Sequence, residues 1–253
     1  MIERVIRLGI LGLILLFSYG CASTSDEDPT EGMAVAEIYD EASTELKNGD
    51  YERAILLYER LESRFPYGKY AERAQMEIAY AYYKDSEPES AIVAADRFIK
   101  LHPNHDNIDY MFYLRGLASY DLSESFLDSL FDVDPSQLDP RSARRAFEYF
   151  AELLKKYPKS HYSKDALQRM TLIRNNLAQY EVHVASYYMR RGAYLAAANR
   201  GKYVIVNYQR TPAMADALAI MVDAYEKLGM TDLANDSKRI LELNYPEHKS
   251  LKK

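Results

Sequence analysis

A turn, a helix and a proline in succession decide the fold of this chain. Residues 48–66 read NGDYERAILLYERLESRFP. Asn48-Gly49-Asp50 predicts a turn, and the apolar residues after it recur at helical spacing. Pro66 ends this helix, because proline has no N–H and restricts the residue before it. Ala54, twelve residues before the proline, is small enough to let an antiparallel helix approach closely. The stretch therefore predicts the second half of a helical hairpin.

The same ending recurs along the chain. Helices are expected to stop at Arg64-Phe65-Pro66, Leu101-His102-Pro103, Lys156-Tyr157-Pro158, Asn207-Tyr208-Gln209 and Asn244-Tyr245-Pro246. An alanine stands twelve residues before the last residue of each, at Ala54, Ala91, Ala146, Ala197 and Ala234. With these alanines as position 20 of a repeat, position 8 falls on Ala42, Ala79, Leu117, Ala185 and Val222. The pattern resembles the tetratricopeptide repeat and predicts an all-α superhelix of five helix pairs.

Two segments exceed the basic repeat. Residues 121–140 (DLSESFLDSLFDVDPSQLDP) form an acidic insertion in repeat three, between its two helices. Two interpretations of it stay open: a loop that packs its apolar residues onto its own hairpin, or a flap that docks a partner. Residues 163–190 have apolar periodicity without Pro or Gly, which predicts one long helix joining repeats three and four. We expect N-terminal repeats one to three over 34–160 and C-terminal repeats four and five over 161–253.

Residues 1–20 are typical of a signal peptide that is removed. Arg4 and Arg7 precede ten apolar residues, 8–17 (LGILGLILLF), a run too short to span a bilayer. Cys21 follows, and it is the only cysteine of the chain. This resembles a lipoprotein signal, in which the cysteine becomes the first mature residue and carries a covalent lipid; an ordinary signal peptide or an uncleaved anchor is the alternative. Residues 21–33 are polar and acidic, so we expect a flexible leash.

Composition excludes several classes of function. One cysteine can form no internal disulfide and no Cys-rich metal site. The formal charge of −6, without basic runs, argues against binding of nucleic acid. The chain has neither a Gly-rich phosphate loop nor a nucleophile motif, and His102 and His105 are more typical of an exposed turn than of a metal site. We therefore expect no enzyme activity, no metal and no cofactor beyond the lipid on Cys21.

The repeat pattern also predicts where a ligand would bind. In tetratricopeptide repeats, side chains at positions 2, 5, 9, 12 and 13 of the first helix tend to line the concave face. Repeat one places Tyr39, Ser43 and Lys47 there, and repeat three places Met111, Leu114 and Ala118 there. The predicted peptide-binding groove comprises Tyr39, Arg73, Met76, Tyr80, Tyr83 and Lys84. Aromatic and Met side chains can hold apolar residues, and the cations can meet a carboxylate. The alternative is that some of these tyrosines pack between repeats.

Several segments of the chain resemble one family. They include residues 65–68 (FPYG), 96–105 (DRFIKLHPNH), 131–134 (FDVD), 177–181 (LAQYE) and 187–194 (YYMRRGAY). They are similar to the BamD family, the lipoproteins of the outer-membrane β-barrel assembly machinery. The resemblance implies lipid anchoring on the periplasmic face of the outer membrane of a Gram-negative bacterium, without enzyme activity.

The resemblance also implies partners. The C-terminal repeats would dock on the barrel-forming subunit BamA through Gly192, Tyr194, Asn199 and Arg200, beside other assembly lipoproteins. The N-terminal repeats would receive the targeting segment of unfolded outer-membrane proteins, which often ends in an aromatic residue with a free carboxylate. The alternative function is a periplasmic repeat lipoprotein that scaffolds cell-wall or Tol-type envelope machinery.

Overall fold

Helices make up nearly all of the described structure. The computed structural model describes residues 28–122, 136 and 139–252, and in these ranges it has ten α-helices and no strand. The helices are α2 (Val35–Asn48), α3 (Tyr51–Arg64), α4 (Lys69–Lys84), α5 (Pro88–Leu101), α6 (Ile108–Asp121), α8 (Arg141–Lys156), α9 (Ser163–Arg190), α10 (Tyr194–Asn207), α11 (Ala213–Lys227) and α12 (Thr231–Asn244), followed by the 3-10 helix η3 (Lys249–Lys252). Consecutive helices form five hairpins, so the predicted all-α superhelix of five helix pairs is confirmed.

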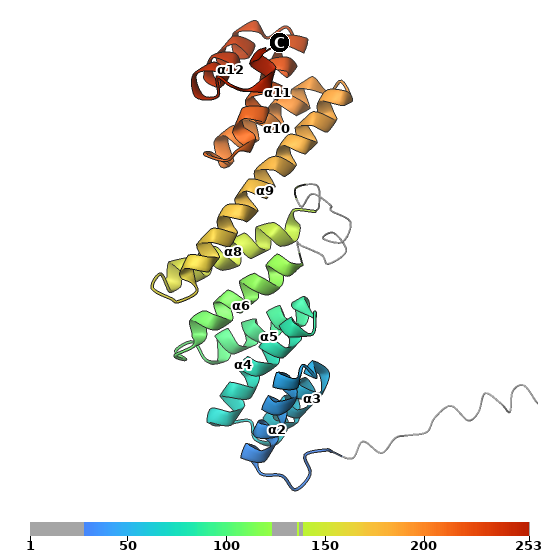
Figure 1. The fold of residues 1–253 in the computed structure, drawn as a ribbon, viewed down its shortest axis with the longest axis vertical. Coiled ribbons are helices and arrows are strands. Elements are labelled where there is room, and N and C mark those ends of the chain that lie inside the picture. Colours follow the sequence, from blue (N-terminus) through green and yellow to red (C-terminus); the bar gives the residue numbers. More distant parts are fainter. Residues whose placement is uncertain (1–27, 123–135, 137–138, 253) are drawn as a thin grey trace, which may run out of the picture.

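The hairpins stack along one long axis, with α2 and α3 at one end and α11 and α12 at the other (Figure 1). The first helices of successive repeats touch, because α2 contacts α4, α4 contacts α6, and α9 contacts α11. The predicted long helix is also confirmed. With 28 residues, α9 is twice the length of α10, and it contacts α8 of repeat three as well as α10 and α11. One continuous helix therefore belongs to both halves of the molecule.

The turn before α3 forms as its sequence predicts. Gly49 has a φ of 84°, in the left-handed region that glycine adopts without steric cost. The Asp50 carboxylate accepts a hydrogen bond from the backbone N–H of Arg53 at 3.1 Å and so caps the first turn of the helix. The chain leaves the helix at Phe65, just before Pro66. Local chemistry thus sets both ends of α3.

The repeated alanines lie where paired helices meet. Ala54, Ala91, Ala146 and Ala197 are fully buried and Ala234 is 4% exposed. In repeat three, however, the small residue of the first helix is Gly116 and not Leu117, which is only partly buried. A Cβ atom on Gly116 would lie 2.4 Å from the ring of Phe150, which is itself fully buried. The expected position 8 of this repeat is therefore wrong by one residue.

A buried cation joins the second and third repeats. Arg115 of α6 is 7% exposed, and its guanidinium donates hydrogen bonds to Asp96 of α5 and Glu152 of α8, both at 2.5 Å. The same group lies 4.1 Å from the ring centroid of Tyr149, a cation–π contact. Three helices thus share one charged centre, and desolvation makes that centre sensitive to the loss of any member.

The folded part of repeat one begins before α2. Thr30 is fully buried, and the Arg64 guanidinium of α3 donates hydrogen bonds to its carbonyl oxygen and, at 2.9 Å, to its hydroxyl oxygen. The last residues of the expected leash, 28–33, thus lie against α3. Residues 1–20 and Cys21 lie outside the described residues, as do positions 123–135 and 137–138 of the insertion. No helix in the described part of the chain is both long and apolar enough to cross a membrane.

Candidate functional site

Tyrosines from successive first helices lie along one side of the N-terminal repeats. At one end, the ring centroid of Tyr39 on α2 is 5.5 Å from that of Tyr70 on α4 and 5.7 Å from that of Tyr58 on α3. Burial raises the pKa of Tyr39, and the nearby Arg73 opposes that shift. The structure therefore brings together two predicted groove residues, Tyr39 and Arg73, from different repeats.

Three more predicted groove residues are partly buried in the next repeat. Met76, Tyr80 and Tyr83 pack against a buried cluster formed by Ala79, Ala95, Phe98, Met111 and Leu114. The pKa of Tyr83 is raised, first by burial and then by a hydrogen bond with Asp121 at the end of α6. Lys84 is exposed at the end of α4. Tyr80 and Tyr83 therefore pack between repeats, and each is only partly buried there.

The line of aromatic residues continues into repeats three and four. Tyr110 and Tyr113 of α6 contact Tyr162, just before α9, at centroid distances of 5.5 and 4.7 Å. The rings of Tyr113 and Tyr162 are stacked, with 16° between their planes. We call the set of Tyr39, Tyr70, Tyr80, Tyr83, Tyr110, Tyr113 and Tyr162 the tyrosine row. It extends the predicted groove from two repeats to the start of the long helix.

A polar pair closes the far end of the tyrosine row. The hydroxyl of Tyr113 donates to the Asp165 carboxylate at 2.6 Å, and Nε of Arg169 donates to the same oxygen at 2.6 Å. Burial, the hydrogen bond and the charge of Asp165 together raise the pKa of Tyr113 to about 12. Tyr113 is therefore a neutral hydrogen-bond donor at physiological pH. The Asp165 carboxylate and the stacked ring of Tyr162 hold it in place.

Sequence reasoning missed Tyr110 and Tyr113 because of the register error in repeat three. Counting from Leu117 put Met111, Leu114 and Ala118 on the ligand-binding face, but all three are buried, at 1% exposure or less. Counting from Gly116 instead puts Tyr110 at position 2 and Tyr113 at position 5. The contact between Gly116 and Phe150 was the missing signal, and it cannot be read from sequence spacing.

The four predicted docking residues do not form one cluster in the structure. Gly192 makes the turn between α9 and α10 with a φ of 73°, and Asn199 is exposed on α10. Tyr194 is partly buried against an alanine-rich cluster of repeats four and five. Arg200 is half-exposed and donates a hydrogen bond to Glu181 at 2.9 Å. That ion pair raises the pKa of Arg200.

Glu181 is the centre of a second charged cluster. Its side chain is 1% exposed and also accepts a hydrogen bond from Arg144 of α8 at 3.2 Å. The pair of arginines comes from repeats three and four, and Glu181 lies on the long helix between them. Arg200 therefore has an internal partner already, in addition to any role at an interface.

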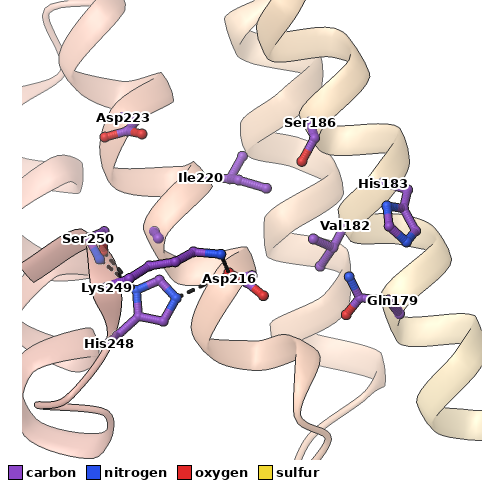
Figure 2. Close-up of a pocket in the computed structure, with 11 residues that line it drawn as sticks. Gln179, Val182, His183, Ser186, Asp216, Ile220, Asp223, His248, Lys249 and Ser250 are labelled. Carbon is purple, nitrogen blue, oxygen red and sulfur yellow. Dashed lines mark hydrogen bonds and ion pairs between the residues drawn. The ribbon is translucent and has the colours of Figure 1, made fainter.

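A pocket of about 430 Å³ lies between α9 and α11, and Figure 2 shows the residues that line it. Its walls carry side chains of α9 and α11, including Gln179, Val182 and Ser186 on one side and Asp216 and Asp223 on the other. The C-terminal segment closes one end, because Asp216 pairs with His248 at 3.1 Å and with Lys249 at 3.3 Å. Positions 2, 5 and 9 of repeat four, Gln179, Val182 and Ser186, all line it, so the repeat register holds here.

Comparison with known proteins identifies the family. A family model described as an outer membrane lipoprotein, YfiO, matches residues 31–240. The outer membrane protein assembly factor BamD of Neisseria meningitidis serogroup A is 45% identical, over 97% of this chain and 92% of that protein. The protein of the same name from Vibrio cholerae is 38% identical, over 93% of this chain and 96% of its own length.

Solved structures add only a distant likeness. The type IV pilus biogenesis factor PilW aligns over 86% of this chain and 96% of its own, with a TM-score of 0.34 and 14% identity. That similarity is too low to relate the two functions. The family model and the relatives do not depend on that likeness, and the relatives match nearly the full length. The chain belongs to the YfiO family of outer membrane lipoproteins.

Proposed function

We propose that this chain is a non-enzymatic scaffold of the outer-membrane β-barrel assembly machinery. It binds the BamA-type barrel subunit and the targeting segment of unfolded outer-membrane proteins, and so promotes their folding and insertion. One observation carries the proposal. Relatives that are 33–45% identical over nearly the whole chain share the name of an outer membrane protein assembly factor.

The tyrosine row supports binding of the targeting segment. All of its tyrosines are only partly buried, so the row offers aromatic surface to the aromatic side chains of an extended peptide. Arg73, Lys47 and Lys84 supply positive charge beside it, and within residues 28–122, 136 and 139–252 none of the three forms an ion pair within 4 Å. A peptide that ends in an aromatic residue with a free carboxylate offers both complementary groups. The site therefore fits the ligand class that the proposal requires.

Replacing Tyr80 and Lys84 together by alanine is expected to weaken peptide binding. The double change removes one aromatic surface and one cation, and we expect a loss of about tenfold in affinity, equivalent to about 1.4 kcal/mol. The measurement is crosslinking and fluorescence anisotropy with a peptide that copies the C-terminus of a barrel precursor. Tyr187→Ala with Lys202→Ala, which removes an exposed tyrosine and an exposed lysine from repeat four, is the control. Equal crosslinking by the wild type and the Tyr80 double variant would place the peptide elsewhere.

The lipid on Cys21 is the proposed anchor to the outer membrane. The family is one of outer membrane lipoproteins, and acyl chains on one cysteine hold a protein firmly when more than one is present. Cys21→Ala is expected to move the chain from the membrane to the soluble fraction. Fractionation is measured in cells that lack the barrel subunit, so that partner binding cannot retain the variant. Continued membrane association there would reject the lipid as the anchor.

The C-terminal repeats are the proposed docking site for the barrel subunit and other assembly lipoproteins. The candidate contacts are Gly192, Tyr194, Asn199 and Arg200. Three of them are exposed to solvent, and Tyr194 is partly buried by its packing against the alanine-rich cluster. Arg200 is about half-exposed even while it pairs with Glu181. It can therefore meet an acidic partner residue without first leaving a buried position.

A further inference from the structure

The pocket between α9 and α11 lies on the face that tetratricopeptide repeats use for ligands. Positions 2, 5 and 9 of the first helix belong to this face in both repeats: Gln179, Val182 and Ser186 in repeat four, and Asp216, Ala219 and Asp223 in repeat five. All six line the pocket, whose volume is about 430 Å³. The C-terminal half therefore has a hollow on its concave face that is large enough for the side chains of a ligand.

The two helices give this pocket an acidic lining. Among the described residues, they place Asp216 and Asp223 in it and no lysine or arginine. Asp223 is exposed, and within the described ranges no lysine, arginine or histidine nitrogen pairs with its carboxylate within 4 Å. The cations beside the tyrosine row, Arg73 and Lys84, have the opposite charge. The pocket therefore favours a cationic ligand, whereas the tyrosine row favours an anionic one.

The C-terminal segment of the chain already brings cationic side chains to the pocket. Nε2 of His248 lies 3.1 Å from Oδ1 of Asp216, and Nζ of Lys249 lies 3.3 Å from the same oxygen. The hydroxyl of Ser250 lies 2.8 Å from Nδ1 of His248 and orients its ring. Figure 2 shows His248 and Lys249 reaching Asp216 from the end of the chain. A short peptide segment with basic side chains thus fits one end of this pocket.

The internal contact leaves the second acid of the pocket without a partner. The side chains of Lys249 and Asp216 are 83% and 36% exposed, so water screens their ion pair and it is easily displaced. Asp223 stands seven positions after Asp216 on α11, which is about 10 Å along the helix axis. An extended chain covers that distance in about three residues. A ligand with two cations three residues apart can therefore reach both acids.

We propose that the pocket between α9 and α11 binds a basic, extended segment of a partner protein, and that residues 248–252 compete with it for Asp216. The proposed contacts of the targeting segment and of the barrel subunit lie elsewhere, so the inference goes beyond the proposed function. One cation of the ligand pairs with Asp223, and a second replaces Lys249 at Asp216. The competing segment lowers the apparent affinity, because it is part of the same chain and acts at a high effective concentration.

The test uses the full-length protein and two labelled peptides with blocked termini. One hexapeptide has lysine at its second and fifth positions with leucine between them, and its copy has glutamine in place of both lysines. Fluorescence anisotropy should show that the wild type prefers the lysine peptide by about tenfold, as expected for two partly exposed ion pairs. Asp216→Asn with Asp223→Asn should abolish this preference and leave the affinity for the glutamine peptide unchanged.

A second double variant tests the competition. His248→Ala with Lys249→Ala removes both side chains that hold Asp216, and it should bind the lysine peptide about fivefold more tightly than the wild type. Affinity for the glutamine peptide should stay the same, because that peptide does not compete for the carboxylate. Unchanged affinity of this variant for the lysine peptide overturns the competition by the C-terminal segment.

Matched variants keep the site itself falsifiable. Asp232→Asn with Asp236→Asn removes two exposed acids of α12 outside the pocket and should bind both peptides as the wild type does. Circular dichroism checks the helical content of each variant, and Asp223→Asn alone, which breaks no internal ion pair, replaces the pocket double variant if that variant unfolds. Equal binding of the two peptides by the wild type overturns the inference, and so does an equal loss in the pocket and α12 variants.

Discussion

Replacing Arg115 by leucine is expected to lower the free energy of unfolding by about 3 kcal/mol. The guanidinium is buried and holds Asp96 and Glu152 at 2.5 Å each. Leucine removes the cation, so Asp96 loses its ion pair with Arg115 and Glu152 retains only Lys156, at 2.8 Å. The side chains of Asp96 and Glu152 are 33% and 37% exposed, so water recovers part of the loss. For that reason we expect a loss of unfolding free energy at the lower end of the range of about 3–5 kcal/mol for removing one partner of a buried ion pair.

The measurement for Arg115 is urea unfolding followed by circular dichroism. Arg239→Leu is the matched control, because Arg239 pairs with Asp236 at 3.0 Å and both side chains are exposed, at 71% and 61%. Exposed pairs are worth about 0–1 kcal/mol, so the control should change stability little. A loss for Arg115→Leu no larger than that of the control would show that the charged centre does not hold α5, α6 and α8 together.

Arg200→Glu is expected to weaken the complex with the barrel subunit by at least about tenfold. It reverses the charge at the proposed ion-pair contact of the docking surface. The structure adds a second effect, which the sequence did not predict. The new carboxylate would face Glu181, which is 1% exposed and would retain only Arg144. We therefore also expect a loss of stability of about 2 kcal/mol.

Two further variants separate these effects of Arg200. Arg200→Met removes the charge without adding an acid beside Glu181, so its stability loss should be smaller while binding still weakens. Lys100→Glu, an equal charge reversal on α5 in the N-terminal half, should leave binding unchanged. Binding is measured by co-purification from detergent-solubilised membranes. Unchanged co-purification of the Arg200 variants removes this residue from the interface, and absence of a BamA-like subunit from the wild-type preparation rejects the scaffold proposal.

The fold could be read from the sequence because every repeat carries its own local signals. Turn residues and a small residue twelve positions before the helix end act over short distances, a proline ends four of the five second helices, and these signals agree for all five second helices. The wrong assignment of position 8 to Leu117 shows the limit of such local signals. The insertion in repeat three separates its two helices, so the fixed spacing between their small residues no longer applies there. Only packing of Phe150 against Gly116 defines the register.

The candidate site could be predicted only in part, for a related reason. Tyr39 on α2 and Tyr80 and Tyr83 on α4 follow from the repeat pattern, and all three belong to the tyrosine row. Tyr162 and Asp165 join it from the start of a later helix, which periodicity within one repeat cannot indicate. The same holds for Glu181, whose two arginines lie 37 and 19 residues away in sequence. Long-range charge pairing needs the superhelix itself.

The single long helix α9 restricts which insertions and deletions this chain can accept during evolution. Its 28 residues rise about 42 Å without a break, so both halves share one backbone axis. Loss or gain of one residue inside that axis would turn everything beyond it by about 100° and shift it by about 1.5 Å. The proposed peptide-binding side of the N-terminal half and the proposed docking side of the C-terminal half would then point in new relative directions. Surface loops can accept such length changes, but this helix keeps the relative direction of the two halves only when the change is close to a whole number of turns, for example about seven or about eleven residues.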